Sequence, residues 1–280
     1  MKVIVSHDVD HLSPREHVRD LVVPKFVVRF GLEWLLGRTR WSEVTLAIQS
    51  LWRGSWQHLK ELMDFDETHG VPSTFFVGVA NGRKLCYSLA DASYWIACIR
   101  RRGFDVGVHG IEYRSAESAR RELELFRKIA GQGTVGVRMH NIGYSPSSVL
   151  LSGADVATLR DVGYSYSSTT FSETGPCSLG AFWEFPIHLM DGHVFQVGRP
   201  WKTRTLAQAK RFTVEYLADA AVRGVSHFSM LFHDVYFADY YRDYQEWYMW
   251  LIEHLRTEGY TLCSYRDALM ELDANARKPC

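Results

Sequence analysis

Short apolar runs rich in β-branched and aromatic residues alternate along this chain with longer segments of helical periodicity. The apolar runs have the length of buried strands and occupy residues 2–6, 73–78, 104–109, 134–138, 164–168, 183–188 and 226–233. Helical patterns fall between several of them, over residues 56–69, 88–102, 116–129, 154–161 and 206–222. This alternation predicts an α/β fold in which βα units surround a mostly parallel sheet or barrel.

The size and composition of the chain fit one globular domain. A length of 280 residues is ordinary for a single α/β barrel, and 46% hydrophobic with 23% charged residues is a globular composition. The formal net charge of +0 argues against nucleic acid as a partner. We therefore expect residues 1–280 to form a single domain.

The cysteines and the apolar segments indicate the cellular compartment in which the protein is expected to work. The five cysteines include no CxxC pair, which argues against a disulfide framework and against a zinc ribbon. The first apolar run is too short for the core of a signal peptide, and no window is long and apolar enough to span a bilayer. We expect a cytoplasmic protein without a transmembrane segment.

The segment after the first predicted strand, residues 12–55, is too long for an ordinary βα connection. Part of it, residues 20–35 (DLVVPKFVVRFGLEWL), mixes apolar runs with two basic residues, as a helical excursion over the barrel mouth does. Two interpretations are open. The favoured one is a small subdomain that covers one end of the core, and the other is an element that docks on a membrane surface or a partner. In either case the insertion is expected to shape substrate access and is a possible interface.

Ionisable side chains stand at the ends of four predicted strands. Asp8 and Asp10 come directly after the first strand, two residues apart, so both carboxylates point to the same face of an extended chain. Two like charges this close need a cation beside them to stay ionised, and a metal ion is the simplest compensation. His109, His140 and His233 follow three other predicted strands.

Each of these residues also has an ordinary structural interpretation. A single histidine at a strand end is more often a hydrogen-bonded structural residue than a ligand, and an aspartate there is often a helix N-cap. These interpretations would have to hold separately at every position, whereas a parallel barrel brings all the strand ends together. The coincidence therefore favours one combined site, made of Asp8, Asp10, His109, Arg138, His140 and His233.

The order of these motifs resembles the polysaccharide deacetylases, also called NodB-homology or carbohydrate esterase family 4 enzymes. SHDVD resembles the first motif of that family in its DVD form, and STFFVGV resembles its second-strand pattern. Four later stretches resemble its metal-binding His region, its arginine motif, its YDSS strand and its catalytic His motif, in the order GFDVGVHG, GVRMHNIGYS, GYSYSSTTF and SMLFHD. The resemblance runs from residue 2 to about residue 267, apart from the insertion.

The resemblance implies a fold and a set of roles. The fold is a distorted (β/α)7-type barrel of the NodB kind, with a helical insertion after strand 1. The roles are Asp8 as general base, Asp10 and His109 as metal ligands, Arg138 as the residue that holds the base, and His233 as general acid. The reaction is hydrolysis of an N-acetyl group on a sugar, and the cofactor is a divalent metal ion, usually Zn²⁺.

One position departs from the pattern of the family. Where the family has a second His, four residues after the first, this chain has Tyr113. A phenol keeps its proton up to pH ~10 and is a poor zinc ligand at neutral pH. Because some relatives with a DVD motif carry a His just after the arginine, we expect His140 to complete the set with Asp10 and His109, leaving open positions for water and substrate. A metal site that has decayed is the alternative.

Several further residues are candidates for supporting roles. Trp201 and Tyr236 follow predicted strands and are candidates to stack on a sugar ring, and Tyr113 is a further candidate substrate contact. Asp191 or Asp234 could tune the pKa of the histidine in SMLFHD.

A cytoplasmic enzyme of this kind is better suited to a soluble or lipid-linked precursor than to a cell-wall glycan. The lead hypothesis is a sugar N-deacetylase of bacterial surface polysaccharide biosynthesis, of the O-antigen or lipopolysaccharide type. Its substrate would be an N-acetylated sugar, carried as a nucleotide sugar or a lipid-linked saccharide. An N-deformylase of a sugar precursor is a close variant, and a non-catalytic carbohydrate-binding relative that has lost the metal is the alternative of a different class.

Overall fold

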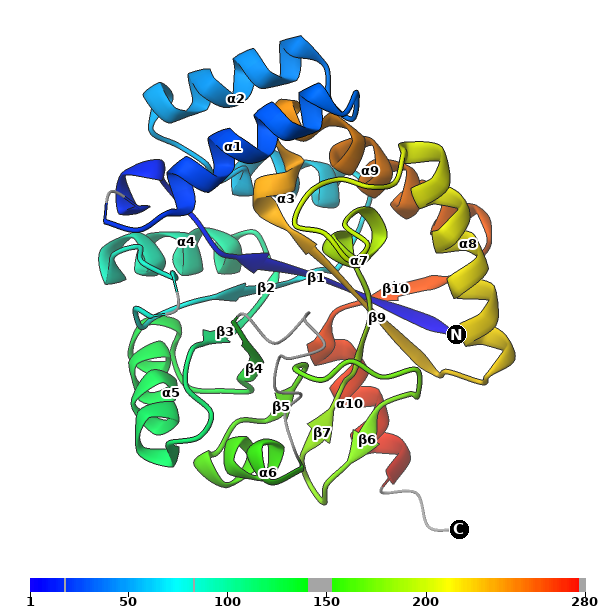
Figure 1. The fold of residues 1–280 in the computed structure, drawn as a ribbon. Helices are drawn as coiled ribbons and strands as arrows, with labels where there is room; N and C mark the ends of the chain where they lie inside the picture. The colour runs from blue at the N-terminus through cyan, green and yellow to red at the C-terminus, as the bar shows by residue number, and fades with distance from the viewer. Residues whose placement is uncertain (18, 83, 141–152, 277–280) are drawn as a thin grey trace.

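The computed structural model describes residues 1–17, 19–82, 84–140 and 153–276, which fold as a curled sheet with helices around it (Figure 1). The strands are β1 (Lys2–Val9), β2 (Thr74–Val77), β3 (Asp105–Gly110), β4 (Gly136–Met139), β5 (Tyr166–Ser167), β6 (Cys177–Ser178), β7 (Trp183–Glu184), β8 (Ile187–Met190), β9 (His227–His233) and β10 (Thr261–Cys263). Every strand predicted from the sequence is present, and the predicted run 183–188 is divided between β7 and β8.

Each helix predicted between the strands is present, and the structure adds others that were not predicted. They are η1 (Pro14–His17), α1 (Val22–Leu35), α2 (Trp41–Arg53), α3 (Leu59–Thr68), α4 (Leu89–Arg101), α5 (Ala116–Ala130), α6 (Gly153–Val162), α7 (Asp191–Phe195), α8 (Leu206–Val222), η2 (Asp234–Phe237), η3 (Asp239–Tyr241), α9 (Arg242–Thr257) and α10 (Tyr265–Ala276). Three of them begin at hydroxyl caps, since Ser88, Ser115 and Thr205 accept from backbone N–H groups in the first turns of α4, α5 and α8. Among the described residues, none of these helices has both the length and the apolar character needed to cross a membrane.

The sheet is curled, and β1 lies in its interior. Its order is β6-β7-β5-β4-β3-β2-β1-β9-β8, and neighbouring strands are parallel except for the pair β6–β7. β7 pairs with β5 and β8 pairs with β9, and only Phe185 and Pro186 separate β7 from β8. The barrel is distorted because one edge of β1 has two partners. Its first residues, Lys2–Ile4, pair with β10, and its later residues, Ser6–Val9, pair with β2. The predicted distorted barrel is therefore confirmed.

Alternate residues of β1 face opposite sides of the barrel wall. Val5 belongs to the large apolar core between the sheet and the helices, whereas Ile4 belongs to a second apolar cluster inside the barrel. Tyr265, the first residue of α10, packs in that inner cluster and stacks on Tyr166. Ser6 and Asp8, which have the same parity as Ile4, continue the inward row toward the carboxyl end of β1.

The insertion after β1 is helical, as predicted. Its helices α1 and α2 lie side by side, shown in blue at one edge of the molecule (Figure 1). Phe26 and Phe30 of α1 pack on the ring of Tyr241, at centroid distances of 6.5 and 5.2 Å. The insertion is thus anchored to the segment that follows β9.

Candidate active site and metal centre

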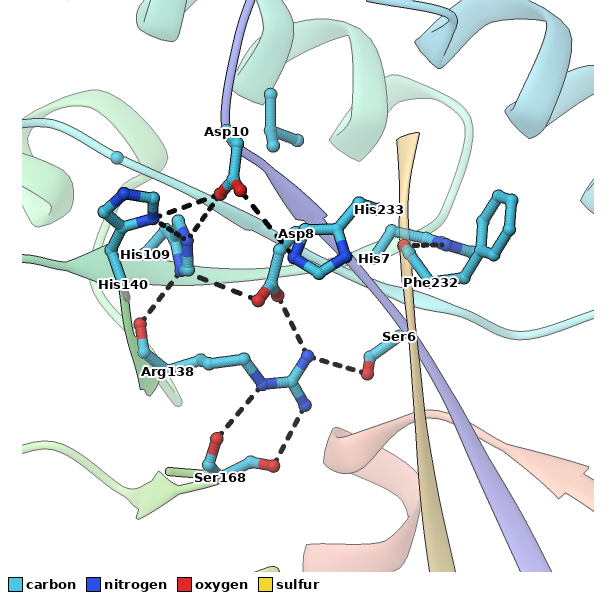
Figure 2. Close-up of polar contacts among 12 residues, drawn as sticks. Ser6, His7, Asp8, Asp10, His109, Arg138, His140, Ser168, Phe232 and His233 are labelled. Atoms are coloured by element: carbon cyan, nitrogen blue, oxygen red, sulfur yellow. Dashed lines mark hydrogen bonds and ion pairs between the residues drawn. The ribbon is translucent and has the colours of Figure 1, made fainter. Parts of the chain in front are cut away.

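The carboxyl ends of β1, β3, β4 and β9 bring five ionisable side chains together (Figure 2). Asp8 is the last residue but one of β1 and lies opposite His233 of β9 in the parallel register, and Asp10 directly follows the strand. His109 is in β3, and His140 follows β4 directly. The residues that the sequence predicted to meet do meet.

Asp10, His109 and His140 place three ligand atoms around one point. Asp10 Oδ1 lies 3.0 Å from His109 Nε2 and 3.1 Å from His140 Nδ1, and the two ring nitrogens are 3.0 Å apart. Ligand atoms bound tetrahedrally to one zinc ion at ~2.0 Å are separated by about 3.3 Å. The spacing of the three atoms therefore fits a divalent ion.

The tautomer of His109 supports the same conclusion. Its Nδ1 lies 3.1 Å from the backbone carbonyl oxygen of Arg138, which only accepts hydrogen bonds, so Nδ1 carries the proton. In the neutral ring, Nε2 then offers a lone pair toward the carboxylate oxygen of Asp10, which also offers only lone pairs. Two acceptors at this distance repel unless a proton or a metal cation lies between them. Orientation of a ligating imidazole through its other nitrogen is typical of metal sites.

The charge of Asp10 is stabilised by its neighbours. Burial acts to raise the pKa of this carboxyl, but His140, His109 and His233 surround it, and their combined effect holds the pKa well below its usual range. Asp10 therefore stays anionic, as a metal ligand must.

Arg138 holds Asp8 inside the barrel. All five N–H groups of its guanidinium have acceptors: Nη1 donates to Asp8 Oδ1 and to Ser6 Oγ, both at 2.9 Å. Nη2 donates to the hydroxyls of Ser168 and Tyr265, at 2.9 and 2.6 Å, and Nε donates to the backbone carbonyl of Ser168 at 3.0 Å. Asp8 is thereby fixed in direction and charge-paired. We call Asp10, His109 and His140 the metal-type cluster, and Asp8 Oδ2 faces it, 3.9 Å from His109 Nδ1.

His233 lies on the other side of Asp10 and is paired with Asp191. Its Nδ1 is 2.9 Å from Asp191 Oδ2, and its Nε2 points toward Asp10 Oδ2 at 3.7 Å. Burial opposes protonation of the ring, but Asp191 and Asp10 outweigh it, so the pKa of His233 lies well above its usual value. Of the two carboxylates proposed to tune His233, Asp191 makes the contact, whereas Asp234 accepts from the backbone N–H of His58 at 3.3 Å.

Two cavities adjoin the cluster, and Asp10 and His233 line both of them. The smaller one, of about 160 Å³, holds Asp8, His109, Arg138 and His140 with the apolar side chains of Met139, Phe171, Ile187, Met190 and Leu231. The larger one, of about 660 Å³, is lined mostly by apolar side chains, and α1 supplies one of its walls. The insertion thus supplies part of the wall of a cavity beside the cluster, and its effect on substrate access stays a prediction.

The three predicted substrate contacts lie in different surroundings. Trp201 and Tyr236 line the larger cavity, and the Tyr236 hydroxyl accepts hydrogen bonds from Arg29 and Gln196. Tyr113 is buried in the apolar core and lines neither cavity among the described residues. Roles in substrate binding stay predictions for all three, and residues 141–145 of the arginine motif lie outside the described residues.

The sequence did not predict the two residues, Ser168 and Tyr265, whose hydroxyls accept hydrogen bonds from Nη2 of Arg138. Ser168 lies in the stretch GYSYSSTTF, so a signal was present there. Tyr265 comes from the start of α10, far away in the chain, and nothing in its neighbourhood indicates that it reaches the barrel interior.

The fold and the cluster define a barrel with a metal-type site at the carboxyl end of its strands. No protein-family model and no curated protein matches the sequence. Among solved structures, a protein of Mycobacterium smegmatis assigned as a polysaccharide deacetylase superposes with a TM-score of 0.64 at 16% identity, covering 99% of this chain and 92% of that chain.

Two further solved structures superpose on this chain over most of their length. A protein of Pseudomonas aeruginosa PAO1 assigned as a polysaccharide deacetylase has a TM-score of 0.58 at 12% identity, covering 96% of this chain and 88% of that chain. PuuE allantoinase has a TM-score of 0.63 at 11% identity, covering 99% of this chain and 91% of that chain. At such identities the likeness is one of fold, and this chain has the polysaccharide deacetylase fold.

Proposed function

We propose that this protein is a metal-dependent hydrolase that removes the N-acetyl group of a sugar in bacterial surface polysaccharide biosynthesis, of the O-antigen type. One observation carries the proposal: three metal-ligand atoms, a charge-paired carboxylate and an imidazole–carboxylate pair converge on one cavity. This is the set of groups that hydrolysis of an unactivated amide requires.

Asp10, His109 and His140 would hold the metal, for which Zn²⁺ is the best candidate because two of its three ligands are imidazoles. When bound, the ion supplies Lewis-acid polarisation of the amide carbonyl.

The protein residues then divide the proton transfers. Asp8, paired with Arg138 at 2.9 Å, takes a proton from the attacking water as the water oxygen bonds to the acyl carbon. His233, held protonated by Asp191, gives its proton to the sugar nitrogen as the C–N bond breaks. Acetic acid and a free amine leave; Asp8 then gives its proton to solvent and His233 takes one proton from solvent, which restores both residues.

The smaller cavity favours an acetyl over a formyl group. Its lining also includes the apolar side chains of Phe171, Ile187 and Leu231, on which a methyl group can pack. A formyl group has no methyl to bury there, so deformylation would forgo about 0.8 kcal/mol or more of binding free energy.

Metal analysis and substrate turnover test the proposal together. Protein purified without chelator should hold about one zinc per chain, and Asp10→Ala should lose it. Asp8→Asn should keep the zinc and lose acetate release in a screen of N-acetylated nucleotide sugars and lipid-linked saccharides. Full activity of Asp8→Asn would refute its role as the base. A metal-free protein that binds glycans without hydrolysing them would establish the non-catalytic alternative.

A further inference from the structure

The helix α1 buries charged residues on the side where Phe26 and Phe30 pack on Tyr241, and it exposes apolar residues on its other side. Its two charged residues in the central turns, Arg29 and Glu33, face inward and pair at 2.9 Å, and Glu33 also accepts from the backbone N–H of Lys202. Val28 and Leu35, on the opposite side, are 59% and 73% exposed. A helix that packs on a core normally buries its apolar stripe and exposes its charges.

The same pattern continues through the connection into α2. We call the exposed side chains of residues 21–53 the hairpin face. On α2, Trp41, Ile48 and Trp52 are exposed and share one stripe because they are spaced by seven and four residues. The rings of Trp34 and Trp41 are 5.2 Å apart and link the two helices. Of the seventeen large hydrophobic side chains that are exposed in the described part of the chain, ten belong to the hairpin face.

The charges of the hairpin face have one sign. Its exposed charged residues are Lys25, Arg38, Arg40 and Arg53. Both acidic residues of this segment, Glu33 and Glu43, are buried. The chain as a whole has a net charge of +0, so this cationic surface is a local feature.

We propose that the hairpin face docks the protein on the surface of an anionic membrane. Exposed aliphatic residues, tryptophans and cations without anions are what the interface between water and an anionic leaflet accommodates. A second copy of the chain is a poorer occupant because it would bring cations against cations. At 1.5 Å per residue the fourteen residues of α1 extend about 21 Å, which suits a helix lying in the plane of the interface.

The larger cavity opens beside this face. Leu21, Val28 and Leu32 of the hairpin face line it, and it leads to Asp10 and His233. If the proposed function holds, on which this step rests, a sugar attached to a membrane lipid reaches the site while its lipid stays in the bilayer. The docked orientation therefore selects lipid-linked saccharides over nucleotide sugars.

Vesicle co-sedimentation tests the docking. The full chain should sediment with vesicles of an equal mixture of phosphatidylglycerol and phosphatidylcholine, more weakly with phosphatidylcholine alone, and less as salt rises. Leu35→Glu/Trp52→Glu should reduce binding to the mixed vesicles by about tenfold or more, and Arg38→Gln/Arg53→Gln by about tenfold. None of these four residues lines either cavity.

The matched control is Val222→Glu/Met270→Glu, which changes two equally exposed apolar residues outside the hairpin face and should bind as the wild type does. Unchanged circular dichroism and melting temperature verify folding of each variant. The proposal is overturned if the wild type ignores the mixed vesicles, if the control loses binding equally, or if the wild type without lipid forms a dimer that Leu35→Glu/Trp52→Glu abolishes. Zinc content and hydrolysis of a soluble saccharide by Leu35→Glu/Trp52→Glu test the proposed function separately.

Discussion

The substitution Arg138→Met should remove most of the stability of the protein. Arg138 is 1% exposed and Asp8 is 3% exposed, so the substitution leaves a carboxylate unpaired inside the barrel. Removing one partner of a buried ion pair costs about 3–5 kcal/mol. Ser6, Ser168 and Tyr265 also lose their donor, which adds about 1 kcal/mol or more. We expect the free energy of unfolding to fall by about 4–6 kcal/mol.

A double-mutant cycle separates the unpaired charge from lost packing. Asp8→Asn leaves Arg138 with its other acceptors, so it should cost only about 1–3 kcal/mol. In Arg138→Met/Asp8→Asn neither charge of this pair remains, so the double variant should be more stable than the sum of the single effects predicts, by about 2 kcal/mol. Urea unfolding with linear extrapolation, in the presence of a chelator, measures each free energy without a contribution from bound metal.

The surface residue Arg102 provides the matched control for this cycle. It pairs with two carboxylates, Asp64 and Glu67, but in contact with solvent. Arg102→Met should therefore cost far less than Arg138→Met, since exposed ion pairs contribute little to stability. Additive effects of Arg138→Met and Asp8→Asn, or equal losses for the two arginine variants, would refute the reasoning.

Three further changes test other parts of the barrel. Under the proposed function activity requires protonated His233, so it should fall as pH rises through the raised pKa of that ring. Asp191→Asn should lower this pKa and move the basic limb of the kcat/KM profile to lower pH. His140→Ala should lose most of the zinc-dependent rise in melting temperature, and an unchanged rise would exclude it as a ligand. A Cβ at Gly136 would lie 1.9 Å from the ring of Tyr166, so Gly136→Ala should lower the unfolding free energy by about 2 kcal/mol or more in urea.

The position of the site could be predicted because it depends on local patterns and one rule of topology. Asp8, His109 and His233 each end an apolar run, and the carboxyl ends of parallel strands meet at one end of a barrel. The spacing of Asp8 and Asp10 placed both carboxylates on one face, and the structure shows them on opposite sides of the same cluster. Their chemical roles stay predictions.

Contacts that depend on distant pairing could not be predicted. Tyr265 reaches Arg138 only because β10 pairs with Lys2–Ile4 and directs the start of α10 into the barrel. The helix α2 was not predicted either, and the favoured interpretation of the insertion did not specify which face of α1 is buried. Apolar residues surround α1 on all sides, so periodicity alone cannot assign its inner face.

The burial of Arg29 and Glu33 explains how α1 can face outward with its apolar side. The carboxylate of Glu33 is satisfied by Arg29 and the backbone of Lys202, and the guanidinium also donates to the hydroxyls of Tyr236 and Tyr244. Because these charges are paired and hydrogen-bonded, their burial costs little, and the aliphatic residues are left to face outward. The residues that form the metal-type cluster make none of these contacts. The proposed membrane-docking surface can therefore change in sequence without altering the contacts of the metal-type cluster.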